Sequence, residues 1–131
     1  MNLRTVLETQ LATLAADATL NTLLGGAHIY MRDSVDVVEQ VPGVYLSGPD
    51  EAPLEEATQR ATVTWDIWAR SSDQALNIET RLRQLMHYET DRVFGGKVSW
   101  SQFAGSSDLP APKGQARRVM ETELLPVRDR T

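Results

Sequence analysis

Two carboxylates that could act together as an acid–base pair lie on one predicted strand. Glu121 and Glu123 are two positions apart, and alternate residues of a strand project from the same face, so these groups are about 7 Å apart. Inside a cleft, such a pair can move protons to and from a substrate. On an open sheet face the commoner meaning is a solvated or contact-forming acidic surface, which Asp66 on another predicted strand would extend.

Patterns typical of other active sites are missing from the sequence. There is no cysteine, and the two histidines, His28 and His87, are far apart, so neither a cysteine-based zinc site nor a His-x-x-x-His pair is present. No serine lies in a Gly-x-Ser-x-Gly elbow. The glycine pairs at 25–26 and 95–96 match neither glycine-rich nucleotide-binding pattern. We therefore expect a protein that is not an enzyme and that uses no metal and no cofactor.

Charge and hydropathy disfavour further classes. The 131 residues carry a formal net charge of −5 and give a pI of about 5.0, whereas nucleic-acid-binding domains usually present a basic face. No stretch approaches the ~18 consecutive apolar residues of a membrane span. The N-terminus lacks the charged segment and apolar run of a signal peptide. We expect a soluble protein that is made in the cytoplasm and has no membrane partner.

The clearest predicted strand spans residues 60–70. Apolar side chains occupy every second position, at Ala61, Val63, Trp65, Ile67 and Ala69. This is the period of a half-buried strand. Trp68 is the exception on the otherwise polar face. Its ring either lies over neighbouring side chains or anchors a binding partner, since tryptophan is enriched at interface hot spots.

Two main helices are predicted, at residues 2–15 and at about 73–88. Each has apolar residues at spacings of three and four, the repeat of an amphipathic helix. Residues 71–73, Ser-Ser-Asp, supply capping candidates for the second helix. Asp17 is positioned to cap a short helix that the glycine pair at 25–26 ends.

The strands come in runs rather than alternating with helices, which predicts an α+β fold. We expect a single domain over residues 1–131, with a largely antiparallel or mixed sheet of about four to five strands and two main helices packed on one face. The last two strands are predicted at 97–104 and 115–125. The opposite face, which an antiparallel sheet can expose to water, is predicted to carry Asp66, Ser101, Arg117, Glu121 and Glu123.

Two long loops are predicted, at 47–60 and 105–114, and residues 128–131 are predicted to form a loose tail. Loops of this length in a small domain are often functional. The first loop carries the carboxylates of Asp50, Glu51, Glu55 and Glu56. The composition of both loops suits arms that become ordered on contact with a neighbouring molecule.

The layout resembles that of the tail completion or tail terminator proteins of long-tailed, non-contractile bacteriophages and related prophages. The resemblance covers nearly the whole chain, from the N-terminal helix through the strand opened by residues 41–44, Val-Pro-Gly-Val. It is strongest at residues 63–71, Val-Thr-Trp-Asp-Ile-Trp-Ala-Arg-Ser. The helix that follows has the family's apolar spacing at Ala75, Ile78, Leu82 and Leu85.

The resemblance implies a structural virion protein that caps the tail tube. Such a protein forms a ring, expected to be a hexamer, on the head-proximal end of the tube, stops the addition of tube subunits and provides the surface that joins the head. Its partners would be further copies of itself, the major tail tube protein and the connector or neck proteins of the head. DNA would pass through without specific binding. Assembly would occur in the host cytoplasm, and the protein would end in the virion.

Two surfaces are assigned within this expected ring. An acidic lumen would not grip DNA phosphates, because like charges oppose such contacts, and the lumen candidates are Asp66, Glu121 and Glu123. The acidic residues at 50–56 are matched with Arg117 and Arg118 of the next subunit, and Trp68 is a further interface candidate. The sheet face with the lumen candidates is alternatively a contact with the neighbouring subunit.

Other functions stay open at the level of sequence. A head-side neck or stopper protein is also small and also forms rings. A small-ligand-binding or enzymatic α+β domain would need a deep pocket with convergent polar groups. A nucleic-acid-binding domain is the alternative that the net charge disfavours.

Overall fold

The computed structural model describes residues 3–31, 41–47, 61–94, 97–124 and 128–129. The helices are α1 (Leu3–Ala15), α2 (Ala18–Leu24) and α3 (Ser72–Met86). The strands are β1 (Ile29–Met31), β2 (Gly43–Ser47), β3 (Ala61–Ala69), β4 (Tyr88–Phe94), β5 (Lys97–Leu109), β6 (Ala116–Leu124) and β7 (Arg128–Asp129). The predicted α+β fold is confirmed.

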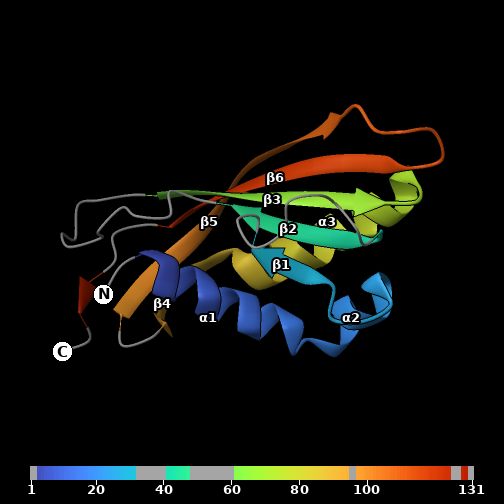
Figure 1. Ribbon diagram of the computed structural model, residues 1–131. Coiled ribbons are helices and arrows are strands. Elements are labelled where there is room, and N and C mark those ends of the chain that lie inside the picture. The colour runs from blue at the N-terminus through green and yellow to red at the C-terminus, as the bar shows by residue number, and fades with distance from the viewer. Residues whose placement is uncertain (1–2, 32–40, 48–60, 95–96, 125–127, 130–131) are drawn as a thin grey trace.

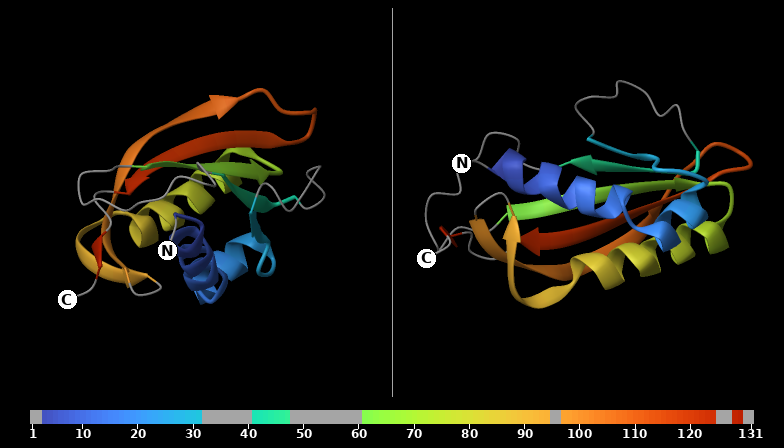
Figure 2. Two further views of the ribbon diagram at one scale, coloured as in Figure 1. Left: turned by 60° about the vertical axis from the view of Figure 1, so that its left-hand side comes forward. Right: turned by 90° about the horizontal axis from the view of Figure 1, so that it is seen from below.

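A single mixed sheet forms one layer and the helices form the other (Figure 1). The strand order is β1-β2-β3-β6-β5-β4, with β7 paired to β5, which makes seven strands in the described part of the chain. β1 and β2 are parallel, and the other pairs are antiparallel. Seen from below, α1, α2 and α3 all lie on the same side of the sheet (Figure 2). The other face of the sheet carries none of the described helices (Figure 2).

The helix ends follow the predicted capping residues. Asp17 accepts a hydrogen bond from the backbone N–H of Leu20 at 2.8 Å and so caps α2, and Gly25 ends that helix with a φ of 74°, where glycine is favoured. Ser71 caps α3 by accepting from the N–H of Gln74 at 3.1 Å. These contacts satisfy amide groups that a helix leaves without partners, so the helix positions are set locally.

The core lies between the helices and the sheet. Alternate residues of β3 are buried as predicted, at Val63, Trp65, Ile67 and Ala69. The helices cover them with buried side chains at Leu7, Leu14, Leu20, Leu24, Ala75, Ile78, Leu82 and Met86. Within this layer the Trp65 indole N–H donates to the Thr122 hydroxyl at 3.0 Å. Each fully buried aliphatic or aromatic side chain stabilises the fold by about 1.5–3 kcal/mol.

Helix α2 is also tied to α3 by an ion pair. The guanidinium of Arg81 binds both carboxylate oxygens of Asp17, at 2.7 and 3.0 Å. The same Asp17 side chain caps α2, so one residue fixes both the start of the short helix and its position against α3. The hydrogen bond from Arg81, together with the one from the Leu20 amide, holds the pKa of Asp17 below its usual value.

The predicted loop at 105–114 is wrong over its first half. β5 continues to Leu109, and the connection to β6 is the short segment 110–115. A register shift between Phe103 and Gly105 lets the strand keep pairing with β6 beyond this point. The serines and glycine of this segment are typical of loops. Their weak preference for a loop is overridden by the hydrogen bonds to a neighbouring strand.

Ser101 was predicted on the polar face and lies instead on the helix side. It pairs with Leu124, cross-strand partners project from the same face, and both residues are fully buried. The register of β5 against β6 therefore decides the orientation, because a shift of one residue moves every side chain to the other face.

Two strands were absent from the prediction. β4 pairs with β5 through Arg92–Ser99 and Val93–Val98. In the predicted tail, Arg128 and Asp129 form β7 and pair with the start of β5, so these two residues are bound to the sheet rather than loose. The predicted loop at 47–60 lies outside the described residues except for Ser47, the last residue of β2.

Candidate interaction surface

The sheet face opposite the helices carries five of the six predicted site residues that the structure describes. The β3–β6 register sets Trp68 opposite Arg117, Thr64 opposite Glu121, and Thr62 opposite Glu123. Asp66 lies between them, opposite Val119. Asp66, Trp68, Arg117, Glu121 and Glu123 therefore share one face, as predicted, while Arg118 faces the helices. We call this surface the open face and divide it into two ends.

The first end, the closed cluster, consists of Tyr45, Asp66, Trp68 and Arg117. The Arg117 guanidinium donates to both oxygens of Asp66, at 2.7 and 2.9 Å, and lies over the Trp68 ring at 4.8 Å from its centroid. The hydrogen bond with Asp66 raises the pKa of Arg117. Asp66 is only 6% exposed, so it adds no free carboxylate to an acidic surface. This differs from the role expected for it beside Glu121 and Glu123.

Tyr45 extends the closed cluster and was not singled out in the sequence. It pairs with Asp66 across β2 and β3 and is 1% exposed although it points away from the helices. Its ring lies 5.5 Å from that of Tyr30, whose hydroxyl is 3.2 Å from His28 Nδ1. The available signal was the position of Tyr45 between Val44 and Leu46, since alternate residues of a strand point to opposite faces. The β2–β3 register then sets Tyr45 on the same face as Trp68.

The indole N–H of Trp68 is buried and has no hydrogen-bond partner among the residues that the structure describes. The Arg117 guanidinium partly covers the ring. Trp68 therefore lies against a neighbouring side chain, which is the first of the two arrangements predicted for it. A role as interface anchor stays a prediction.

Arg118 joins three elements on the helix side. Its guanidinium binds Glu79 of α3 at 3.0 Å, Asp108 of β5 at 2.8 Å and the Ser106 hydroxyl at 2.9 Å. These contacts raise the pKa of Arg118, with the hydrogen bond to Asp108 as the largest cause. They also fix the far part of β5, which sequence reasoning had assigned to a loop.

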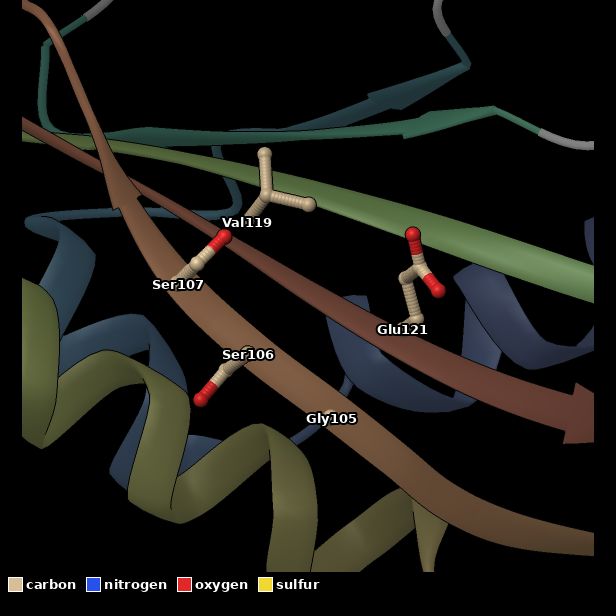
Figure 3. A pocket seen from close by; sticks show the side chains of 5 residues that line it. All are labelled: Gly105, Ser106, Ser107, Val119 and Glu121. Atoms are coloured by element: carbon tan, nitrogen blue, oxygen red, sulfur yellow. The ribbon is translucent and has the colours of Figure 1, made fainter.

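The second end, the open end, consists of Ser107, Glu121 and Glu123 around a hollow. The hollow has a volume of about 170 Å³ and is lined by Gly105, Ser106, Ser107, Val119 and Glu121. Figure 3 shows the side chains of Ser107, Val119 and Glu121 on one side of the β5–β6 hairpin, while Ser106 points toward α3. Glu121 is exposed and has no hydrogen bond or ion pair among the described residues. The hollow therefore combines a free carboxylate and a hydroxyl with an apolar wall.

A tight turn closes the hairpin beyond the hollow. The N–H of Gln115 donates to the carbonyl of Pro112 at 3.0 Å, and Gly114 has a φ of 83°, which suits the third position of a type II turn. Lys113 occupies the second position and is exposed. The turn lies at the right-hand edge of the molecule in Figure 1.

Comparison with protein families matches residues 11–122 to the family described as "Tail completion protein gp17". The chain belongs to this tail completion family. Among solved structures, it is similar to a chain of the "Virion of native gene transfer agent (GTA) particle", with a TM-score of 0.65 and 15% sequence identity over 94% of this chain and 92% of that chain. A likeness at this identity shows a shared fold. A comparison with curated proteins gives no match.

As a member of the tail completion family, this chain is a structural tail protein rather than an enzyme. No group of three histidine, aspartate or glutamate side chains in the described ranges could hold a metal ion. His87 accepts the backbone N–H of Phe103 at 2.9 Å and so supports the start of the β5 extension. None of the described helices is long and apolar enough to cross a bilayer.

The predicted acidic partners of Arg117 and Arg118 lie outside the described residues. These are Asp50, Glu51, Glu55 and Glu56. The pairing of this segment with the two arginines of a neighbouring copy of the tail completion protein stays a prediction. Both guanidiniums already bind carboxylates of their own chain, so a neighbour's carboxylates would have to compete with these.

Proposed function

We propose that this tail completion protein caps the head-proximal end of the phage tail tube as a ring, stops tube polymerisation and provides the surface that joins the head. The observation that carries the proposal is the family match over residues 11–122. A fold shared with a chain of a gene transfer agent virion supports it. The partners are other copies of this chain in a hexamer, the major tail tube protein and the connector proteins of the head. Assembly takes place in the host cytoplasm and the ring stays in the virion.

The size of the domain supports a ring. A chain of 131 residues with helices packed against one sheet has no room to enclose a DNA duplex, so several copies must surround the channel through which DNA passes. A repeated contact between unlike surfaces of the same chain closes into such a ring when the rotation per subunit divides the circle. The net charge of −5 suits a channel that DNA crosses without specific binding.

The open face has two possible roles in this ring. Glu121 and Glu123 either line the lumen, where they would repel DNA phosphates, or meet the neighbouring subunit. The hollow beside Glu121 favours the second role for that residue, since a lumen wall needs no recess. Glu123, two residues along the same strand, remains the lumen candidate.

An early stop codon in this gene of the parent genome tests the proposed function. Electron microscopy should reveal overlong tubes of irregular length beside heads without tails, and a plasmid copy of the wild-type gene should restore normal particles. Tails of normal length that fail to join heads would move the protein to the joining step or to the head-side neck. Infectious particles of normal appearance would overturn the proposal.

A further inference from the structure

Most charged side chains of the described residues are satisfied within the chain. Ion pairs join Asp17 to Arg81, Asp66 to Arg117, and Arg118 to Glu79 and Asp108. Arg70 donates to the carbonyl of Val41, and the Arg83 guanidinium lies over the Phe103 ring at 3.9 Å. Among the side chains that the structure describes, Lys113 is the cation for which no such contact exists.

Lys113 is held in a position to reach another molecule. It lies at the second position of the Pro112–Gln115 turn, at the tip of the β5–β6 hairpin. The hydrogen bond across the turn and the conformation of Gly114 fix the backbone beneath it. A lysine is a point charge on a flexible aliphatic stem, so this tip presents an ammonium group from a defined base.

The hollow at the open end has the chemistry to receive that side chain. Glu121 offers an unpaired carboxylate, Ser107 a hydroxyl and Val119 an apolar wall. An ammonium group takes up to three acceptors, while the methylene stem of lysine packs along apolar surface. The volume of about 170 Å³ gives room for one long side chain and little more.

The two features cannot meet within one molecule. Glu121 is five residues along β6 from Ala116, which is about 16 Å at the rise of an extended strand, and the turn adds further distance. Both features belong to one stiff hairpin, so the gap does not close by bending. A contact between them therefore requires two molecules.

We propose that Lys113 of one copy enters the hollow of the next copy and forms an ion pair with Glu121. The knob and the hollow occupy different places on the chain, so the contact is heterologous and repeats from subunit to subunit, as a closed ring requires. The occupant is a second copy of this chain because the unpaired charges at the two features are opposite and both belong to it. This inference deepens the proposed ring and rests on it.

A charge swap tests the contact in assembled tails. The strain with the early stop codon is supplied with plasmid copies of wild type, Lys113→Glu, Glu121→Lys, or the double variant. Each single reversal sets like charges against each other, which opposes association, and should reduce the amount of this protein in purified tails at least about tenfold. The double variant restores opposite charges and should return that amount to within about twofold of wild type.

Glu123→Lys is the matched control. Glu123 is a second β6 carboxylate with no partner among the described residues, but it does not line the hollow, so its reversal should leave the amount of protein in tails unchanged. Melting temperatures verify the folding of each variant, and substitutions at the exposed residues Lys113 and Glu121 should shift them by less than about 4 °C.

The outcomes separate this contact from the proposed function. Single reversals that assemble like wild type overturn the contact and leave the ring in place. A double variant as defective as the single ones also overturns it, and it points to a different protein as the partner of one feature. If the strain with the stop codon makes normal tails without any plasmid, the proposed function fails, and the contact fails with it.

Discussion

The two ends of the open face contain similar residues in opposite situations. In the closed cluster the Asp66 carboxylate is 6% exposed and binds Arg117 through two hydrogen bonds. At the open end, Glu121 is exposed and has no partner among the described residues. The same residue class on the same sheet face thus stabilises the chain at one end and is available for association at the other. A carboxylate that is paired within its own chain stabilises the fold, and one that is unpaired can bind another molecule. Pairing therefore distinguishes these two roles better than position on the sheet does.

Equivalent substitutions of Asp66 and Glu121 should show the largest difference in stability between the two ends of the open face. Asp66→Asn removes the negative charge and leaves the partly buried Arg117 without its carboxylate, which should lower the free energy of unfolding by about 3 kcal/mol. Glu121→Gln, on the same face, should change it by less than about 0.5 kcal/mol. Urea denaturation of both variants measures this, and equal effects would contradict the division of the face.

Substitution of Arg118 should have the next largest effect. Arg118→Met keeps the aliphatic stem but leaves the nearly buried Glu79 carboxylate unpaired, which should destabilise the protein by about 2 kcal/mol. Amide hydrogen exchange should accelerate at residues 105–109, since Arg118 binds Ser106 and Asp108. Arg83→Met, an exposed arginine that contacts the Phe103 ring, is the control and should leave exchange at 105–109 unchanged.

Substitution of the two tryptophans of β3 should have smaller effects on stability, and the two effects should differ. Trp65→Phe removes the hydrogen bond to Thr122 and should cost about 1–2 kcal/mol. Trp68→Phe removes a buried N–H that has no partner in the described part of the chain. Loss of this unsatisfied group offsets the lost packing, so the cost should stay below about 1 kcal/mol. Thermal unfolding of both variants tests the order. A larger loss for Trp68→Phe would mean that its N–H has an acceptor.

The smallest effect is expected for Asp17 and depends on pH. The folded-state pKa of Asp17 is lowered, mainly by Arg81, so its ionic contribution is present above the ordinary aspartate pKa of about 3.9 and is lost as pH falls through the folded value. Asp17→Asn keeps a capping side chain but loses the charge. Wild type should be more stable than this variant at pH 7, and the difference should shrink below about pH 4 in urea titrations. A difference that persists undiminished in acid would contradict the ionic origin.

Local patterns in the sequence predicted the elements that carry their own signals. The alternation in β3, the capping roles of Asp17 and Ser71 and the two faces of β6 all agree with the structure. Each depends on neighbouring residues along the chain, so each can be read without knowing the rest of the fold. The α+β class follows from their order.

Features that depend on distant partners were missed. β5 beyond Phe103 has loop-like composition and is a strand because β6 and Arg118 hold it. The orientation of Ser101 depends on its pairing with Leu124, so its prediction on the polar face was wrong. Arg117 and Arg118 were treated as one basic patch, although neighbouring residues of a strand point to opposite faces.

The candidate surface was predicted in part for the same reason. Strand periodicity correctly set Asp66, Trp68, Arg117, Glu121 and Glu123 on one face. It could not tell which of these charges are paired, because ion pairs between β3 and β6 depend on register. The hollow and the position of Lys113 depend on the bulge and the turn of the hairpin, which the prediction of a loop at 105–114 concealed.

The outer part of the hairpin is fastened twice, by the Pro112–Gln115 turn at its tip and by Arg118, which binds β5 and α3 just behind that turn. Its backbone therefore loses little conformational entropy when another molecule contacts it. Association that must first order a loop loses part of its binding energy to that ordering. A contact made by this hairpin avoids most of that loss, so a small area of surface can give useful affinity without slow rearrangement.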